Sequence, residues 1–81
     1  MEKLKYIKTP EDEIVIFPMT IQHLKFKHLN PVSAGFCSIR SGKVDCYGDS
    51  YSLELESQRE DSMIATNQVF GILSSIAQPS T

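Results

Sequence analysis

The chain has 81 residues, of which 41% are hydrophobic and 22% are charged, and its formal net charge is −2. This length suits one small domain, and the composition excludes a disordered or fibrous chain. The acidic net charge argues against a domain that is basic over its whole surface. No stretch approaches the roughly 18 apolar residues of a membrane span, and the first residues carry charges where a targeting segment would be apolar. We therefore expect a cytoplasmic protein.

Residues 3–8 and residues 13–17 flank the turn-forming residues 9–12. This arrangement predicts a β-hairpin with Lys8 opposite Glu13 and Tyr6 opposite Val15, a register that brings opposite charges together in the first pair. The second strand of this hairpin is apolar on both of its sides. That pattern is typical of a strand inside a sheet that is covered on both faces.

Residues 20–29 follow Pro18, which cannot donate a ladder hydrogen bond and therefore ends the strand before it. They predict a short helix with Thr20 at its N-cap and with Asn30-Pro31 at its end. The apolar stripe of this helix would consist of Ile21, Leu24, His28 and Leu29. A strand over the same residues is the alternative, but the stripe and the Asn-Pro stop favour the helix.

The ten residues from Cys37 to Cys46 form two alternating runs joined by Ser41-Gly42. A two-residue turn at this dipeptide predicts a hairpin in which the two cysteines face each other. The other expected pairs are Arg40 with Lys43, Ile39 with Val44 and Ser38 with Asp45. Since pairs alternate along such a hairpin, the cysteines fall at a non-hydrogen-bonded position, where Cα atoms lie about 4.5 Å apart.

Cys37 and Cys46 are therefore a candidate redox pair, because that separation is compatible with a disulfide. In a cytoplasmic protein, however, we expect two buried, reduced thiols that fill space in the core. A structural zinc would need His23 and His28 as further ligands, but these histidines are five residues apart and would point in different directions on a helix. The sequence predicts no metal and no cofactor.

Residues 51–56 alternate between apolar and polar side chains. The pattern predicts a half-exposed strand with Tyr51, Leu53 and Leu55 facing inward. The preceding Gly48 indicates a bend between this strand and the central hairpin.

A C-terminal helix is predicted after Ser57, which has the spacing of a capping box with Glu60. This helix either ends at Gly71 or continues toward Pro79. The heptad spacing of four apolar residues favours the longer helix. These residues are Ala65, Val69, Ile72 and Ile76. Residues 1–77 are expected to form one domain, and residues 78–81 a frayed tail.

The sequence carries no recognisable catalytic arrangement. No serine lies in a nucleophile elbow, the four glycines are scattered singly, and no glycine-rich phosphate loop is present. The carboxylates of residues 11–13 lie in a turn, where such side chains are usually solvated. We therefore predict that the protein is not an enzyme.

The charges are distributed unevenly along the chain. Residues 14–44 contain no Asp or Glu, whereas residues 45–61 contain six acidic residues and one base. Four bases in the middle segment are candidate contacts for nucleic acid or another anion: Lys25, Lys27, Arg40 and Lys43. Complementary patches for self-association, or charges that merely cover the monomer, are the other interpretations.

Two apolar features are left without an obvious partner inside the chain. Phe36 and Tyr47 lie opposite each other on the polar face of the central hairpin, where they could form a contact surface. The last helix has its heptad stripe and, on a different side, Met63 and Phe70. A small domain with two apolar helix sides is a candidate homodimer. The candidate interaction surface therefore consists of Phe36, Tyr47, Val69, Ile72 and Ile76.

Together these patterns predict a small α+β domain with a largely antiparallel sheet of about five strands and two helices, in the order β-β-α-β-β-β-α. The expected function is that of a non-enzymatic protein-interaction or regulatory module that self-associates. The alternative is a regulator that binds nucleic acid or another anionic partner through the basic segment 23–43.

Overall fold

The computed structural model describes the backbone of residues 3–77. It describes the side chains of residues 3–71. The elements in chain order are the strands β1 (Lys3–Lys8) and β2 (Ile14–Phe17), the 3₁₀ helix η1 (His23–Leu29), the strands β3 (Ser33–Arg40), β4 (Lys43–Tyr47), β5 (Asp49–Ser50) and β6 (Leu55–Glu56), and the helix α1 (Asp61–Ala77). No helix in this part of the chain is long and apolar enough to cross a membrane.

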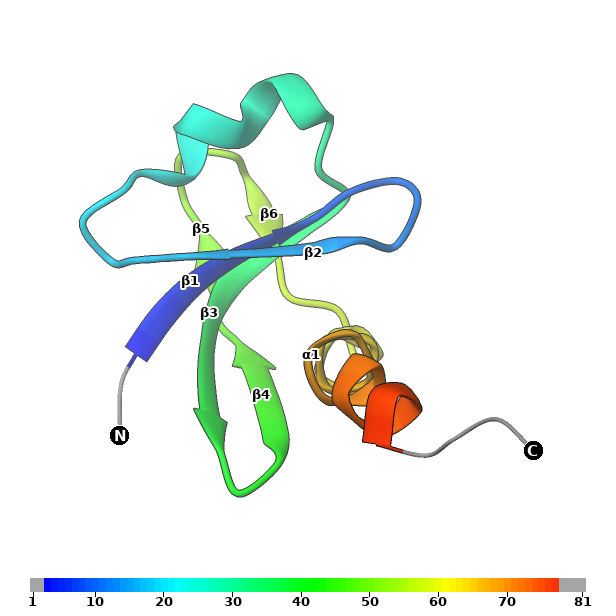
Figure 1. Ribbon diagram of the computed structural model, residues 1–81. Coiled ribbons are helices and arrows are strands. Elements are labelled where there is room, and N and C mark those ends of the chain that lie inside the picture. Colours follow the sequence, from blue (N-terminus) through cyan, green and yellow to red (C-terminus); the bar gives the residue numbers. More distant parts are fainter. Residues whose placement is uncertain (1–2, 78–81) are drawn as a thin grey trace.

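The strands form a four-stranded sheet in the order β2-β1-β3-β4 and a separate two-stranded sheet of β5 and β6. Every strand pair is antiparallel. The prediction of a small, largely antiparallel α+β fold is confirmed. Figure 1 shows η1 near one end of the large sheet and the β3–β4 turn at the other, with α1 beside β4.

The register predicted for the first hairpin is wrong by one residue. Lys8 lies opposite Ile14, and Tyr6 opposite Ile16. The turn takes up one more residue than expected, because Asp12 adopts a positive φ of 62° and the Thr9 N–H donates to the Glu13 carbonyl. A shift of one residue exchanges the two sides of a strand, so Ile16 shares a face with Tyr6 where Val15 was expected.

The strand β2 is also not inside the sheet but at its edge. Its two apolar sides are nevertheless both covered, as the sequence indicated. Ile14 and Ile16 belong to the core on the α1 side of the sheet, and Val15 and Phe17 to the core on the other side. Apolar residues on both sides of a strand therefore indicate that both faces of the sheet are covered at that strand. They do not indicate that the strand has a hydrogen-bonded neighbour on each side.

The central hairpin has the predicted register. Cys37 lies opposite Cys46, and the flanking pairs run from Phe36/Tyr47 to Arg40/Lys43. The turn residues Ser41 and Gly42 have φ angles of 48° and 77°. Two consecutive positive φ angles are the requirement of the tight turn that matches the twist of its strands.

The predicted first helix exists, but it is a 3₁₀ helix that begins at His23, and Thr20 is not its N-cap. Asn30 ends it with a left-handed conformation. Half of the predicted apolar stripe is wrong, since Leu24 and His28 are exposed, whereas Ile21 and Leu29 pack against the core as predicted. The buried or half-buried side chains of η1 are His23, Phe26 and Leu29. Their spacing of three residues follows from the three residues per turn of a 3₁₀ helix.

The strand predicted over residues 51–56 is interrupted. Only β6 is extended, and the residues before it form the turn from β5, with Glu54 at a φ of 55°. Leu53 and Leu55 pack against the core as predicted, but Tyr51 is 95% exposed and does not face inward. Tyr51 begins the turn, and its carbonyl accepts the Glu54 N–H, so strict alternation no longer applies to it.

The helix α1 extends to Ala77, which confirms the longer of the two predicted helices. Its start differs from the prediction: the Asp61 carboxylate, and not Glu60, accepts the backbone N–H three residues before it, that of Gln58, at 2.9 Å. This is the reciprocal half of a capping box, moved by one residue. The expected tail at 78–81 lies outside the described residues.

Polar side chains of α1 take the place of a neighbouring strand at both edges of the large sheet. At β4, the Cys46 N–H donates to the Ser62 hydroxyl at 2.8 Å, and the Val44 N–H donates to the Thr66 hydroxyl at 2.9 Å. At β2, the Gln68 amide binds the N–H and the C=O of Ile14, at 2.7 and 2.6 Å. Exposed strand edges are prone to pair with other chains, so α1 protects both of these edges.

Two cores lie on the two faces of the sheet. The core on the α1 side contains Tyr6, Ile14, Cys37, Val44 and Ala65. The core on the η1 side contains Ile7, Phe17 and Ala34, covered by side chains from η1 and from the turn between β5 and β6. The domain is thus a sheet between a long helix on one face and a short helix with a small hairpin on the other.

Candidate functional site

Phe36 and Tyr47 lie on the η1 side of the sheet, at the part of that face where the cover by η1 ends. Their ring centroids are 6.2 Å apart, and Tyr47 is 40% exposed. The ammonium group of Lys3 lies 4.4 Å from the centroid of the Phe36 ring, a cation–π contact. We call the surface formed by Lys3, Phe36, Ser38, Asp45 and Tyr47 the aromatic face.

A row of rings connects the aromatic face to the core beneath η1. His23 makes edge contacts with Phe17 and with Phe36, at centroid separations of 5.5 and 5.9 Å. Its Nε2 atom is 2.9 Å from the Gly35 carbonyl oxygen. Burial lowers the pKa of His23 below its ordinary value of 6.5, and the nearby Lys5 lowers it further, against the opposing effect of the Gly35 bond. This buried histidine supports Phe36 from below and is not accessible as a base.

The two cysteines lie on the opposite side of the hairpin, toward α1. Cys37 is buried, Cys46 is half-buried, and both thiols are free. Burial raises the pKa of Cys37 to about 11 and that of Cys46 to about 12, with Cys37 and Asp61 adding to the second increase. At neutral pH both thiols are therefore protonated, which makes them slow nucleophiles.

The four candidate anion-binding bases do not come together in the fold. Lys25 and Lys27 are on η1, whereas Arg40 and Lys43 are at the β3–β4 turn, at the other end of the sheet (Figure 1). Asp45 lies 3.9 Å from Arg40 and 3.5 Å from Lys43. The basic segment of the sequence is thus two separate pairs of bases in space, and one pair has an acidic neighbour.

The three residues of α1 in the candidate interaction surface are not equally well described by the structure. Val69 packs against the core on the α1 side, together with Ile64 and Phe70. Ile72 and Ile76 belong to α1, but their side chains lie outside the described residues. Met63 is 63% exposed. The heptad stripe therefore begins as a core contact of the monomer.

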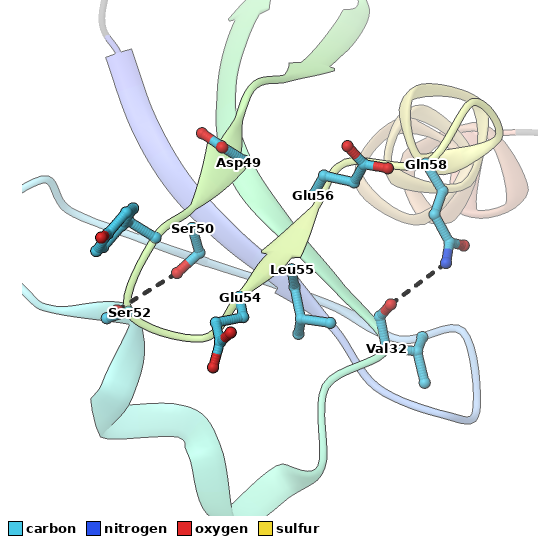
Figure 2. Close-up of a pocket in the computed structure, with 9 residues that line it drawn as sticks. Val32, Asp49, Ser50, Ser52, Glu54, Leu55, Glu56 and Gln58 are labelled. Carbon is cyan, nitrogen blue, oxygen red and sulfur yellow. Dashed lines mark hydrogen bonds between the residues drawn. The ribbon is translucent and has the colours of Figure 1, made fainter.

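A depression of about 770 Å³ lies along the β5–β6 hairpin, and no pattern in the sequence indicated it. Its lining residues are Val32, Asp49, Ser50, Tyr51, Ser52, Glu54, Leu55, Glu56 and Gln58. Figure 2 shows Gln58 reaching across to the Val32 carbonyl, to which its side-chain amide donates at 3.3 Å. Three carboxylates and no base line this depression, so its field attracts cations. It contains no pair of a nucleophile and a base.

A second depression, of about 540 Å³, lies between the β3–β4 turn and the first turns of α1. Lys43 and Arg59 line it from two different segments of the chain, and hydroxyl and amide groups are also part of the lining. The complete lining is Gly42, Lys43, Arg59, Ser62, Met63, Thr66 and Asn67. Sequence reasoning treated Arg59 as an isolated base in an acidic segment and did not place it beside Lys43.

A buried ion pair joins β1 to the start of α1. Lys8 and Asp61 are 2% and 0% exposed, and the Lys8 Nζ is 2.8 Å from the Asp61 Oδ1. The Tyr6 hydroxyl donates to Asp61 Oδ2 at 2.5 Å, and the Lys8 ammonium donates to the Gln58 side chain at 2.9 Å. These buried groups link α1 to the sheet. A ligand could reach them only after α1 had moved.

The pKa values of this cluster shift in opposite directions. Burial alone would raise the pKa of Asp61, but the bonds from the Gln58 N–H, Lys8 and Tyr6 outweigh it and hold the pKa below its ordinary value. Burial, together with the Asp61 carboxylate, raises the pKa of Tyr6 far above its ordinary value. The folded state therefore holds an ionised Asp61 beside a neutral Tyr6.

The candidate zinc ligands are separated by the sheet. His23 lies on the η1 side, whereas both cysteines face α1. Within residues 3–77 there is no group of three or more His, Cys, Asp or Glu side chains arranged to hold a metal ion.

No protein-family model matches the chain, and no curated protein or solved structure matches it either. Its function has therefore to be inferred from its own surfaces.

Proposed function

We propose that this protein is a non-enzymatic interaction module that self-associates through the aromatic face. The observation that carries the proposal is the position of Tyr47. Tyr47 is 40% exposed and lies beside Phe36, whereas the apolar residues Ile7, Phe17 and Ala34 on this side of the sheet are buried under η1 and the β5–β6 hairpin. Tyrosine is enriched at protein interfaces because it combines a large apolar ring with a hydroxyl group that can remain hydrated.

The rigid support of the two rings favours binding. Phe36 contacts the edge-on ring of His23, and the Lys3 ammonium group lies over the face of its ring. A preorganised side chain loses little conformational entropy when a partner covers it. The aromatic face also carries both signs of charge, Lys3 and Asp45, and a two-fold arrangement of two copies can bring such charges opposite each other.

Sedimentation equilibrium over a concentration series tests this proposal. We expect wild-type protein to associate and Tyr47→Ser to shift the equilibrium toward the monomer by tenfold or more. Tyr51→Ser is the matched control, because Tyr51 is 95% exposed in the β5–β6 turn and lies off the aromatic face. A wild-type chain that stays monomeric, or equal effects of both substitutions, would refute the proposal.

The second candidate function is the binding of nucleic acid or another anion. It is favoured by the depression that Lys43 and Arg59 both line, since two bases beside hydroxyl and amide groups suit a phosphate. Affinity for an oligonucleotide should then fall steeply with salt and should weaken in Lys43→Gln and Arg59→Gln. Lys25→Gln, on η1, is the control. Undetectable binding at low ionic strength would exclude this function.

A further inference from the structure

The Cys37/Cys46 pair has the backbone arrangement of a cross-strand disulfide site. The two residues are direct partners in the β3–β4 register. The Cys46 N–H donates to the Ser62 hydroxyl of α1, so it points away from β3. The Val44 N–H likewise donates to Thr66. This direction identifies the cysteine pair as non-hydrogen-bonded, for which Cα atoms lie about 4.5 Å apart, within the range that a disulfide spans.

The surroundings of the two thiols differ, and this difference sets an order of reaction. Cys37 is 0% exposed in the core on the α1 side. Cys46 is half-buried and lies at the edge strand, beneath the first turns of α1. An external reagent therefore reaches Cys46 first. Cys37 is shielded from solvent, and its direct partner across the strands is the Cys46 side chain.

We propose that Cys37 and Cys46 are a redox modification site that closes to an intrachain disulfide by exchange with a small disulfide such as oxidised glutathione. The Cys46 thiol loses its proton to water, and its sulfur attacks one glutathione sulfur, which releases one glutathione. The Cys37 thiol then loses its proton, and its sulfur attacks the Cys46 sulfur of the mixed disulfide, which releases the second glutathione. Two electrons and two protons pass from the protein to the oxidant, and the S–S bond of glutathione is exchanged for that of the protein.

The consequence is local to the central hairpin. A bond between Cys37 and Cys46 fixes the register of the strands that carry Phe36 and Tyr47 on the other face. Because the thiols are protonated at neutral pH, closure should be slow at pH 7 and faster at higher pH. The proposal does not depend on self-association.

The test is incubation of the folded wild-type chain with defined ratios of oxidised to reduced glutathione, followed by intact mass measurement. We expect the loss of two hydrogen atoms from the monomer, without a lasting glutathione adduct. Trypsin cleaves after Arg40 and Lys43, between the two cysteines, so the peptides 28–40 and 44–59 should remain joined until a reductant is added. A lasting glutathione adduct, disulfide-linked dimers or two unreacted thiols would each overturn the proposal.

Two variants test the order of the steps. Cys37→Ser should stop at a glutathione adduct on Cys46, whereas Cys46→Ser should leave Cys37 unmodified in the folded protein. An adduct that forms equally fast in both variants would contradict the assigned order. The wild-type measurement decides the proposal by itself if either variant does not fold.

Discussion

The two faces of the sheet are closed in different ways. On the α1 side, a long helix covers the sheet, supplies hydrogen-bonding groups to both strand edges and is fastened by the buried Lys8–Asp61 pair. On the η1 side, a short 3₁₀ helix and a two-stranded hairpin cover only part of the face, and Tyr47 remains half exposed. Both sides have an apolar core, but the α1 side adds to it hydrogen bonds at the strand edges and a buried ion pair. The surface that we propose for self-association lies where the cover of the η1 side ends.

The largest effect on stability is expected when the charge of Asp61, which links α1 to the sheet, is removed. Asp61→Asn keeps a group that can accept the Gln58 N–H but removes the buried counter-ion of the Lys8 ammonium and leaves it, among the described residues, only the exposed Asp12 and Glu60 carboxylates, at 3.9 and 3.8 Å. Breaking a buried ion pair in this way costs about 3–5 kcal/mol of the free energy of unfolding, enough to unfold a small domain. Chemical denaturation at pH 7 measures this loss.

Glu60→Gln is the control for that substitution. Glu60 lies 3.8 Å from the Lys8 ammonium, but its side chain is 51% exposed, so its removal should cost less than about 1 kcal/mol. Equal losses in the two variants would show that burial of the Asp61 charge does not decide the stability of this side.

A smaller loss is expected where α1 takes the place of a neighbouring strand. Ser62→Ala and Thr66→Ala each remove the hydroxyl that satisfies the outward backbone groups of Cys46 and Val44. Each should lower the free energy of unfolding by about 1–3 kcal/mol, the cost of an unsatisfied buried group. Asn67→Ala, at an exposed position of the same helix, should have little effect in the same denaturation experiment. If it were as destabilising as the other two, the loss would come from the helix and not from the strand edge.

The two sides should also respond to acid in different pH ranges. The pKa of His23 is lowered on folding, so its contribution to stability is complete above 6.5 and is lost as the pH falls below that value. The pKa of Asp61 is also lowered, so its contribution is complete above 3.8 and is lost only at stronger acidity. Thermal unfolding between pH 7 and pH 3 should therefore show two separate declines. His23→Phe should remove the first and keep the second; a first decline that persists in this variant would assign it to another group.

The smallest effect, and the only gain, is expected at Gly71 in α1. A Cβ atom added there would have no atom within 4 Å, so an alanine fits without strain. Gly71→Ala should raise the free energy of unfolding by up to about 1 kcal/mol, because alanine is the better helix former. The loss of stability below pH 6.5 should stay unchanged in this variant, since it comes from His23 on the η1 side. Unfolding curves at pH 7 and pH 5.5 check both parts.

Local chemistry explains which parts of the fold could be predicted. The β3–β4 register followed from Ser41-Gly42, because a two-residue turn with positive φ angles allows only one pairing. The β1–β2 register did not, since the longer turn there accommodates an extra residue at Asp12 without changing the strand pattern. The buried side of η1 was not predicted correctly, because the prediction used the period of an α-helix and η1 has the three residues per turn of a 3₁₀ helix.

The candidate site also has parts that the sequence predicted and parts that it did not predict. The side of the sheet that carries Phe36 and Tyr47 followed from the alternation of the hairpin. No local signal indicated that Lys8 would be buried, because lysine is almost never fully buried without a partner, and its partner is far away along the chain. The pairing of Lys43 with Arg59 in one depression likewise joins two distant segments.

The sequence by itself determined an α+β domain, a central hairpin with opposed cysteines and a long C-terminal helix, because each depends on contacts between neighbours in the chain. Only the tertiary structure decided that β2 is an edge strand, that Asp61 is a buried counter-ion for Lys8, and that α1 seals both edges with Ser62, Thr66 and Gln68. Those contacts join residues between 16 and 54 positions apart. Their formation depends on how the whole chain packs, which no short stretch of the sequence specifies.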